Sequence, residues 1–393
     1  MSSYFDYFLF VTLVFGLLTI IRHRYHSGVL WFFFVAWVVP IQLSQFSDLP
    51  LNRNWEKITV IATTLALFGL YIGYYAGLSI PLKLISKQSR NLNYNVLSKV
   101  SLSLQLVILL SFIYLFIKLG RPPLFSGNVL ENRKLIQEMN PLLWSVVQLS
   151  FITSTISTIL FLNGYWGKLN KYLFFTILIC ISLTGWRNFI LLYLGYFSLP
   201  ILFKRKVNLG RLFIVLGLLV FGFVFIGYLR GDLGDEYNTV NAIGLVALYV
   251  YPGFLNFETL AADGDPSRHL YTLQFFLKPI LDFFNFNTSP PQTSIDAFNV
   301  ATALNPLYQD GGIVNIFVTT FLIGFFLQRL ESNKINGILP TFWRSTLILT
   351  VVFFHNGWLL LNFMPTYNTV IFIIAYVFIA SINKRIQNNR IVT

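Results

Sequence analysis

The sequence predicts an all-α, polytopic membrane protein with about eleven transmembrane helices. Of its 393 residues, 55% are hydrophobic and only 11% are charged, and the mean hydropathy is +0.67. Apolar runs of about 18 or more residues, long enough to cross a bilayer, recur along the chain. They are apolar on every face, whereas the strands of a membrane β-barrel alternate over about ten residues. These observations favour a helical bundle.

The apolar runs define the spans in chain order. We expect them near 4–21, 29–46, 58–80, 97–118, 142–162, 171–186, 189–203, 211–229, 313–329, 344–362 and 367–382. The sixth and seventh spans are short and meet at Gly-Trp-Arg-Asn, 185–188. All of them belong to one expected membrane domain, 1–393, and the lone Cys180 is expected to be a packed hydrophobic side chain.

Lysine and arginine predict the orientation, because cytoplasmic loops retain positive charge. Most of the 28 basic residues fall in alternate segments that contain one acid, Glu331. Those segments are 22–28, 81–96, 163–171, 204–211, 329–344 and the tail after Ile382. We therefore expect the N-terminus outside and the C-terminus in the cytoplasm, and the net charge of +13 is explained by topology rather than by nucleic-acid binding.

Two larger external loops follow from this scheme, at 119–141 and 230–312. The second is the main one and is too apolar for a free linker. Within it, Val240–Phe257 and Leu270–Phe286 are expected to be re-entrant or interfacial helices. The external surface is therefore the predicted place of function.

Three arginines fall at expected external helix ends: Arg121, Arg187 and Arg230. Arginine at a helix end can simply extend its head group to the membrane surface. The alternative is recognition of a lipid diphosphate, whose oxygens suit bidentate guanidinium contacts. Asp232, two residues after Arg230, could orient that arginine or merely pair with it.

The main external loop also offers acids and bases. His269, which follows Arg268, Glu258 and Asp310 are candidates for accepting a proton from an attacking hydroxyl. A solvated loop histidine and a helix-capping Asp310 are the structural alternatives.

Metal and cofactor sites are not expected. Asp263-Gly264-Asp265 has the Asp-x-Asp spacing of metal-dependent glycosyltransferases, but Gly264 and the following Pro266 favour a turn. The sequence has no histidine and cysteine ligand cluster, phosphate-binding glycine loop or serine nucleophile elbow.

The order of these features resembles the O-antigen polymerase family, the Wzy-type oligosaccharide repeat unit polymerases of bacterial envelopes. The resembling segments, covering about 170 to 330, are Gly-Trp-Arg-Asn (185–188), Tyr-Leu-Arg-Gly-Asp (228–232), Tyr251-Pro252-Gly253 with Asn256-Phe257, and Asn299 to Gly312 leading into a helix with Gly324. The repeated arginine-to-glycine spacing of some members does not follow Arg187 or Arg230.

The resemblance implies glycosyl transfer outside the bacterial cytoplasmic membrane. A growing glycan on undecaprenyl diphosphate would move to a sugar hydroxyl of an incoming lipid-linked repeat unit, with a possible chain-length regulator and flippase as partners. Arg187 and Arg230 would stabilise the diphosphate leaving group without a metal, and Asp310 or His269 would accept the proton. Substrate-binding candidates are Arg121, Asp232, Tyr251, Asn256, Glu258, Arg268, Asn299, Thr302 and Tyr308.

Other functions remain open at this point. A flippase or transporter of lipid-linked glycans would have charged or broken helices at mid-membrane and pseudo-symmetric halves. An O-antigen ligase would use the same donor with a lipid A core acceptor. A membrane acyltransferase is disfavoured by the lack of a histidine-bearing early helix.

Overall fold

The computed structural model describes residues 56–79, 93–125, 141–204, 253–262, 302–332, 337–353 and 364–391. These residues form helices and short connections, and no strand occurs among them. Five helices are long and apolar enough to cross a membrane: Lys57–Ser79, Tyr94–Phe125, Ser145–Leu162, Leu304–Leu330 and Pro365–Arg385. Two shorter apolar helices cover Asn188–Leu202 and Ile338–Val352. The predicted all-α membrane architecture is confirmed, and the expected spans at 4–21, 29–46 and 211–229 lie outside the described residues.

The chain separates into two compact units. Unit 1 comprises Met1–Ser86, Tyr237–Ile335 and Thr346–Phe363, and unit 2 comprises Lys87–Glu236, Asn336–Ser345 and Met364–Thr393. Each unit has its own helix packing, described separately below.

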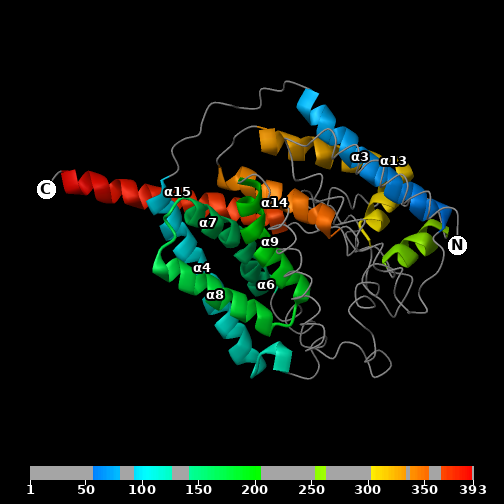
Figure 1. Ribbon diagram of the computed structural model, residues 1–393. Helices are drawn as coiled ribbons and strands as arrows, with labels where there is room; N and C mark the ends of the chain where they lie inside the picture. The colour runs from blue at the N-terminus through cyan, green and yellow to red at the C-terminus, as the bar shows by residue number, and fades with distance from the viewer. Residues whose placement is uncertain are drawn as a thin grey trace, which may run out of the picture. The chain divides into compact units, whose positions relative to one another are not determined.

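Unit 1 is built on two helices, α3 (Lys57–Ser79) and α13 (Leu304–Ser332), which lie side by side (Figure 1). Three glycines of α3, four residues apart, permit the close approach. An added Cβ would meet Phe317 and Thr320 at Gly69, Phe321 at Gly73, and Phe325 and Gln328 at Gly77. The partner residues rise in number with the glycines, so the two helices are parallel. Small residues at this spacing are a common way to bring membrane helices together, because lipid supplies no hydrophobic drive for their association.

A break divides α13 at two glycines. Gly312 has φ 66° and ψ −156°, a conformation that only glycine adopts readily, and Gly311 beside it is also non-helical. The break leaves a short helix at 304–310 and a long one that packs on α3. The expected span began at 313, directly after this break. Residues 304–310, which were expected to be part of a loop, are helical.

Unit 2 contains a bundle of helices. They are α4 (Tyr94–Leu119), the 3₁₀ turn η1 (Pro123–Phe125), α6 (Pro141–Gln148), α7 (Ser150–Leu162), α8 (Lys168–Leu183), α9 (Arg187–Lys204) and α15 (Met364–Ile391). The boundary between the units falls within α14 (Ile338–Val352). A turn at Thr184–Trp186 separates α8 from α9, as expected for the sixth and seventh spans.

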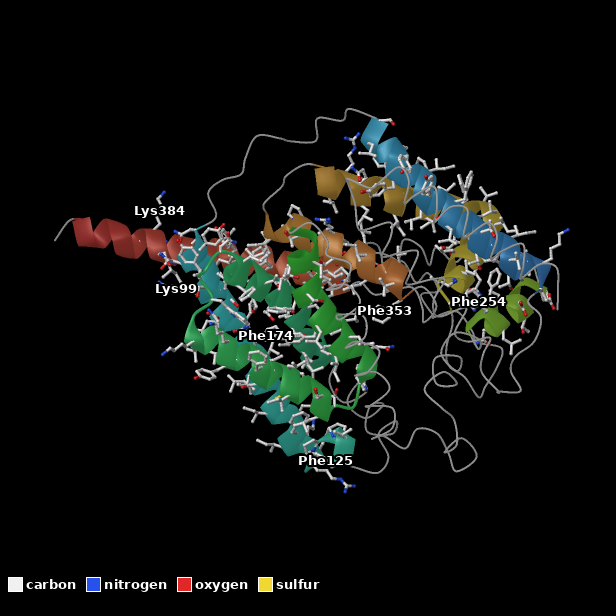
Figure 2. All side chains as sticks on the ribbon, in the orientation of Figure 1. Lys99, Phe125, Phe174, Phe254, Phe353 and Lys384 are labelled. Atoms are coloured by element: carbon white, nitrogen blue, oxygen red, sulfur yellow. The ribbon has the colours of Figure 1, made fainter. Side chains whose placement is uncertain are left out.

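Buried hydroxyls connect the helices of unit 2. Ser154 and Thr158 of α7 each donate a hydrogen bond of 2.7 Å to a backbone carbonyl of α9, at Tyr193 and Phe197. At the other side of the bundle, Lys99 Nζ of α4 donates to Asn383 Oδ1 of α15 at 2.8 Å; Figure 2 shows Lys99 beside this helix. The two bonds between α7 and α9 rise together in residue number, so these helices are parallel, which agrees with the alternating order of the predicted spans.

One expected boundary differs clearly. The tenth span was expected from 344, but α14 begins at Ile338. The starting segment Ile-Leu-Pro, 338–340, places its proline in the first helical turn, where the missing backbone N–H has no helical partner to lose.

Candidate functional site

A helix over residues 253–262 packs at the N-terminal end of the α3 and α13 pair in unit 1 (Figure 1). It belongs to the main external loop of the sequence analysis and overlaps the end of the expected interfacial segment Val240–Phe257. Its aromatic side chains, Phe254 (labelled in Figure 2) and Phe257, are fully buried. The Phe257 ring meets the Tyr308 ring edge-on, with centroids 5.5 Å apart. Two segments from opposite ends of the loop thus pack against one another.

Glu258 joins this helix to α3. Its side chain is only 3% exposed. Oε1 accepts hydrogen bonds from the Glu56 backbone N–H and from the Thr59 hydroxyl, both at 2.9 Å. The first N–H groups of a helix have no partner within the helix, and the helix dipole favours an anion there. Glu258 therefore caps α3 from a segment about two hundred residues away.

Further polar groups are buried in unit 1, in the helix 253–262 and at the start of α13. Asn256 is 1% exposed and Thr302 is fully buried. The Thr302 hydroxyl donates to Asn305 Oδ1 at 3.0 Å, while Asn305 Nδ2 is buried without a hydrogen-bond partner. Buried amides normally make all their hydrogen bonds. The Asn305 amide nitrogen can therefore still donate a hydrogen bond to a group bound in unit 1.

Asp310 is the last residue before the break in α13, and it is half-buried. Across the break, Asn315 Nδ2 donates to the Leu307 carbonyl at 2.8 Å, and the Thr319 hydroxyl donates to Asn315 Oδ1 at 3.2 Å. The Asn315 side chain thus bonds the Leu307 carbonyl, which has lost its hydrogen-bond partner within the helix because of the break. These contacts stabilise the break and fix where Asp310 and Tyr308 lie.

Of the three candidate arginines, Arg121 and Arg187 have described backbone, and both belong to unit 2. Arg121 is exposed and follows α4 after Gly120, and Arg187 is the first residue of α9. Asn170 near the start of α8 donates to Ser98 near the start of α4, so these two helices run parallel and end on the same side of the unit. Arg121 and Arg187 follow those two ends and so share one end of unit 2.

The described residues thus bring together Asn256, Glu258, Thr302, Tyr308 and Asp310 in one unit and Arg121 and Arg187 in the other. The remaining predicted site residues lie outside the described residues: Arg230, Asp232, Tyr251, Arg268, His269 and Asn299.

Sequence reasoning missed Thr59, Glu56 and Asn305. Thr59 lies in an apolar helix and gives no local signal, since a threonine in a span usually bonds its own helix. Asn305 is the third residue after Thr302, a spacing typical of helix starts, which could have indicated the helix at 304–310.

The buried side chains of unit 1 can form hydrogen bonds with a bound polar group. Among the described residues, no group of three histidine, cysteine or acidic side chains could hold a metal ion. No family model, curated protein or solved structure matches this chain.

Proposed function

We propose that this protein is a membrane glycosyltransferase that polymerises undecaprenyl-diphosphate-linked oligosaccharide repeat units at the outer face of the bacterial cytoplasmic membrane. The product would be an O-antigen, a capsule or an exopolysaccharide. The proposal includes eleven spans, an external N-terminus and a cytoplasmic C-terminus.

The observation that carries the proposal is the packing of 253–262 and 302–310 at one end of the parallel α3 and α13 pair. Both segments come from the main external loop, and they concentrate candidate acids and hydrogen-bonding groups at the end of two membrane helices. A lipid-linked sugar presents its reacting atoms at that depth, because its diphosphate stays at the membrane surface while its lipid remains in the bilayer. The resemblance to O-antigen polymerases rests partly on the same segments.

The arginines are proposed to stabilise the diphosphate leaving group. As the glycosidic carbon leaves the donor diphosphate, negative charge grows on the phosphate oxygens, and preorganised guanidinium groups stabilise that charge. Arg187 and Arg230 are the proposed pair, with Arg121 binding the donor diphosphate from the same end of unit 2 as Arg187.

The acceptor hydroxyl must lose a proton during transfer. Asp310 or His269 is the proposed base, and Asp310 lies at the break in α13, one turn after the buried segment with Thr302 and Asn305. Tyr308, Asn256, Tyr251 and Asn299 are proposed to bind sugar hydroxyls. Glu258, held by α3, is proposed to keep the helix 253–262 in place for them.

Gene deletion with complementation tests the proposal. The deleted strain should make surface lipid capped with a single repeat unit, and wild type should restore the ladder of longer chains on a gel. Arg187→Ala and Arg230→Ala at confirmed membrane levels should not restore it. Arg385→Ala, which removes an exposed arginine from the far end of α15, is the matched control and should restore it fully.

A flippase of lipid-linked glycans is the second candidate, because α13 is broken within an otherwise span-length helix, as transporter helices often are. Loss of every repeat unit from the surface on deletion would favour the flippase or an O-antigen ligase. An unchanged ladder would exclude all three functions in that organism.

A further inference from the structure

A stripe of polar side chains enters the apolar bundle of unit 2 between α4, α7 and α8. We name it the α4 seam; it consists of Ser98, Ser101, Gln105, Ser157 and Asn170. Ser101, Gln105 and Ser157 are fully buried, and Asn170 is 3% exposed. Ser98, Ser101 and Gln105 are spaced three and four residues apart, so they share one face of α4 over about 10 Å of its length.

Two hydrogen bonds cross between helices along this seam. Asn170 Nδ2 donates to Ser98 Oγ at 2.8 Å, and Gln105 Nε2 donates to Ser157 Oγ at 3.2 Å. These bonds use only one polar atom of each amide. They fix where the other atom of each amide lies.

Three buried oxygens of the seam have no hydrogen-bond partner: Ser101 Oγ, Gln105 Oε1 and Asn170 Oδ1. Exchanging the oxygen and nitrogen of either amide would only leave a nitrogen unpaired instead. An unpaired buried polar group costs on the order of 1–3 kcal/mol, and the cost rises in the apolar interior of a membrane bundle. Three such groups on one stripe favour an occupant that supplies hydrogen-bond donors.

The seam begins close to exposed residues of unit 2. Ser98 is half-buried, and its neighbour Lys99 is exposed at the N-terminal end of α4. Asn170 is the third residue of α8, directly after the exposed Lys168 and Leu169. The polar side chains of the seam therefore begin beside exposed residues at the N-terminal ends of α4 and α8 and continue inward to Gln105, with the buried Leu97 and Leu104 beside them.

We infer that the α4 seam is a water-binding crevice that opens at the N-terminal end of α4 and holds ordered water against Ser101, Gln105 and Asn170. Water is the smallest molecule that donates to neutral oxygens, and buried waters typically bridge such otherwise unpaired groups. No carboxylate belongs to the seam, so a bound cation would lack the counter-charge that stabilises it in an apolar interior. This inference is independent of the proposed glycosyl transfer.

Thiol labelling tests the inference in the intact protein, reconstituted in nanodiscs and carrying Cys180→Ala. Ser101→Cys is compared with Val100→Cys, because Val100 is the adjacent, fully buried apolar residue. A small charged methanethiosulfonate reacts only with a thiolate, which forms in water and not in dry surroundings. Ser101→Cys should react at least tenfold faster than Val100→Cys. Equal rates would overturn the inference.

A second pair guards against a folding defect at one position. Gln105→Cys is compared with Ile108→Cys, another fully buried residue of α4, and should again react faster. Labelling of Ser101→Cys is then repeated in sodium, potassium and choline chloride at equal ionic strength. Equal rates support water, whereas protection by one alkali cation alone would overturn the water assignment in favour of that cation.

Discussion

The Thr59 hydroxyl of α3 donates a 2.9 Å hydrogen bond to Glu258 Oε1, although 199 residues separate the two in the chain. Both side chains are buried. The bond fastens the helix over residues 253–262 to the N-terminal end of α3. It gives this helix a fixed position, which the proposed site for lipid-linked sugars needs.

Replacing Thr59 tests this connection. Thr59→Val keeps the shape of the side chain but removes the donor, and hydrogen bonds to charged groups contribute about 1.5–3 kcal/mol. We expect the free energy of unfolding to fall by that amount. Thermal unfolding in detergent measures it. Thr63→Val is the matched control, since the Thr63 hydroxyl donates only to the carbonyl of Thr59 in its own helix. Equal losses for the two variants would show that the contact with Glu258 contributes nothing.

The close packing of α13 on the glycines of α3 leads to a second prediction. A Cβ at Gly73 would overlap the backbone of Phe321, so α3 and α13 must move apart in Gly73→Ala. Overpacking of this kind costs about 1–3 kcal/mol. Gly167→Ala is the control, because an added Cβ there meets nothing within 4 Å. Melting temperatures should fall for Gly73→Ala and stay close to wild type for Gly167→Ala; the opposite order would contradict the parallel packing.

The break in α13 depends on Gly312. Alanine is strained at its φ of 66° and ψ of −156°, at a cost of about 1–3 kcal/mol. If the break positions Asp310 and Tyr308 for catalysis, Gly312→Ala should shorten the glycan ladder even where its membrane level equals wild type. A full-length ladder at a normal protein level would show that polymerisation does not need the break in α13.

The spans seen here were largely predictable, because continuous hydrophobicity over a fixed length decides where a helix crosses a bilayer. The predicted 58–80 and 97–118 match α3 and α4 within a few residues. The helix at 304–310 was not predicted, because its polar composition with Pro306 resembles a turn. Packing of Leu304 and Leu307 in the core favours the helix in the folded protein.

The candidate site was predictable in kind but not in arrangement. Glu258 and Tyr308 stood out as polar or aromatic residues in an external loop. The partners of Glu258 did not, because pairing across about two hundred residues leaves no trace in local spacing. The glycines of α3 were visible in the sequence, but nothing local indicated that α13 packs on them.

Membrane orientation gives a further prediction. In a Cys180→Ala background, single cysteines at Ala262 and Phe125 should react with a membrane-impermeant maleimide from the outside, since both positions are exposed. Cysteines at the exposed Ser79 and Lys384 should react only after the membrane is opened. Labelling of Ser79 and Ala262 from the same side would contradict the proposed topology.

Metal independence follows from the arginine mechanism. If guanidinium groups stabilise the leaving diphosphate, polymerisation should persist in excess EDTA. Arg187→Lys should retain part of the rate that Arg187→Ala loses, because lysine keeps the charge but not the bidentate contact. Complete loss in EDTA with recovery on adding a divalent cation would contradict this mechanism.

Reaction of the purified protein with its substrate tests the central claim most directly. The protein is reconstituted in liposomes with undecaprenyl-diphosphate-linked repeat units as the only substrate, and the products are separated by size. The account predicts lipid-linked chains of two and more repeat units, together with released undecaprenyl diphosphate, and neither product with Arg187→Ala. Movement of the lipid-linked unit between leaflets without any chain growth would contradict it and identify a transporter instead.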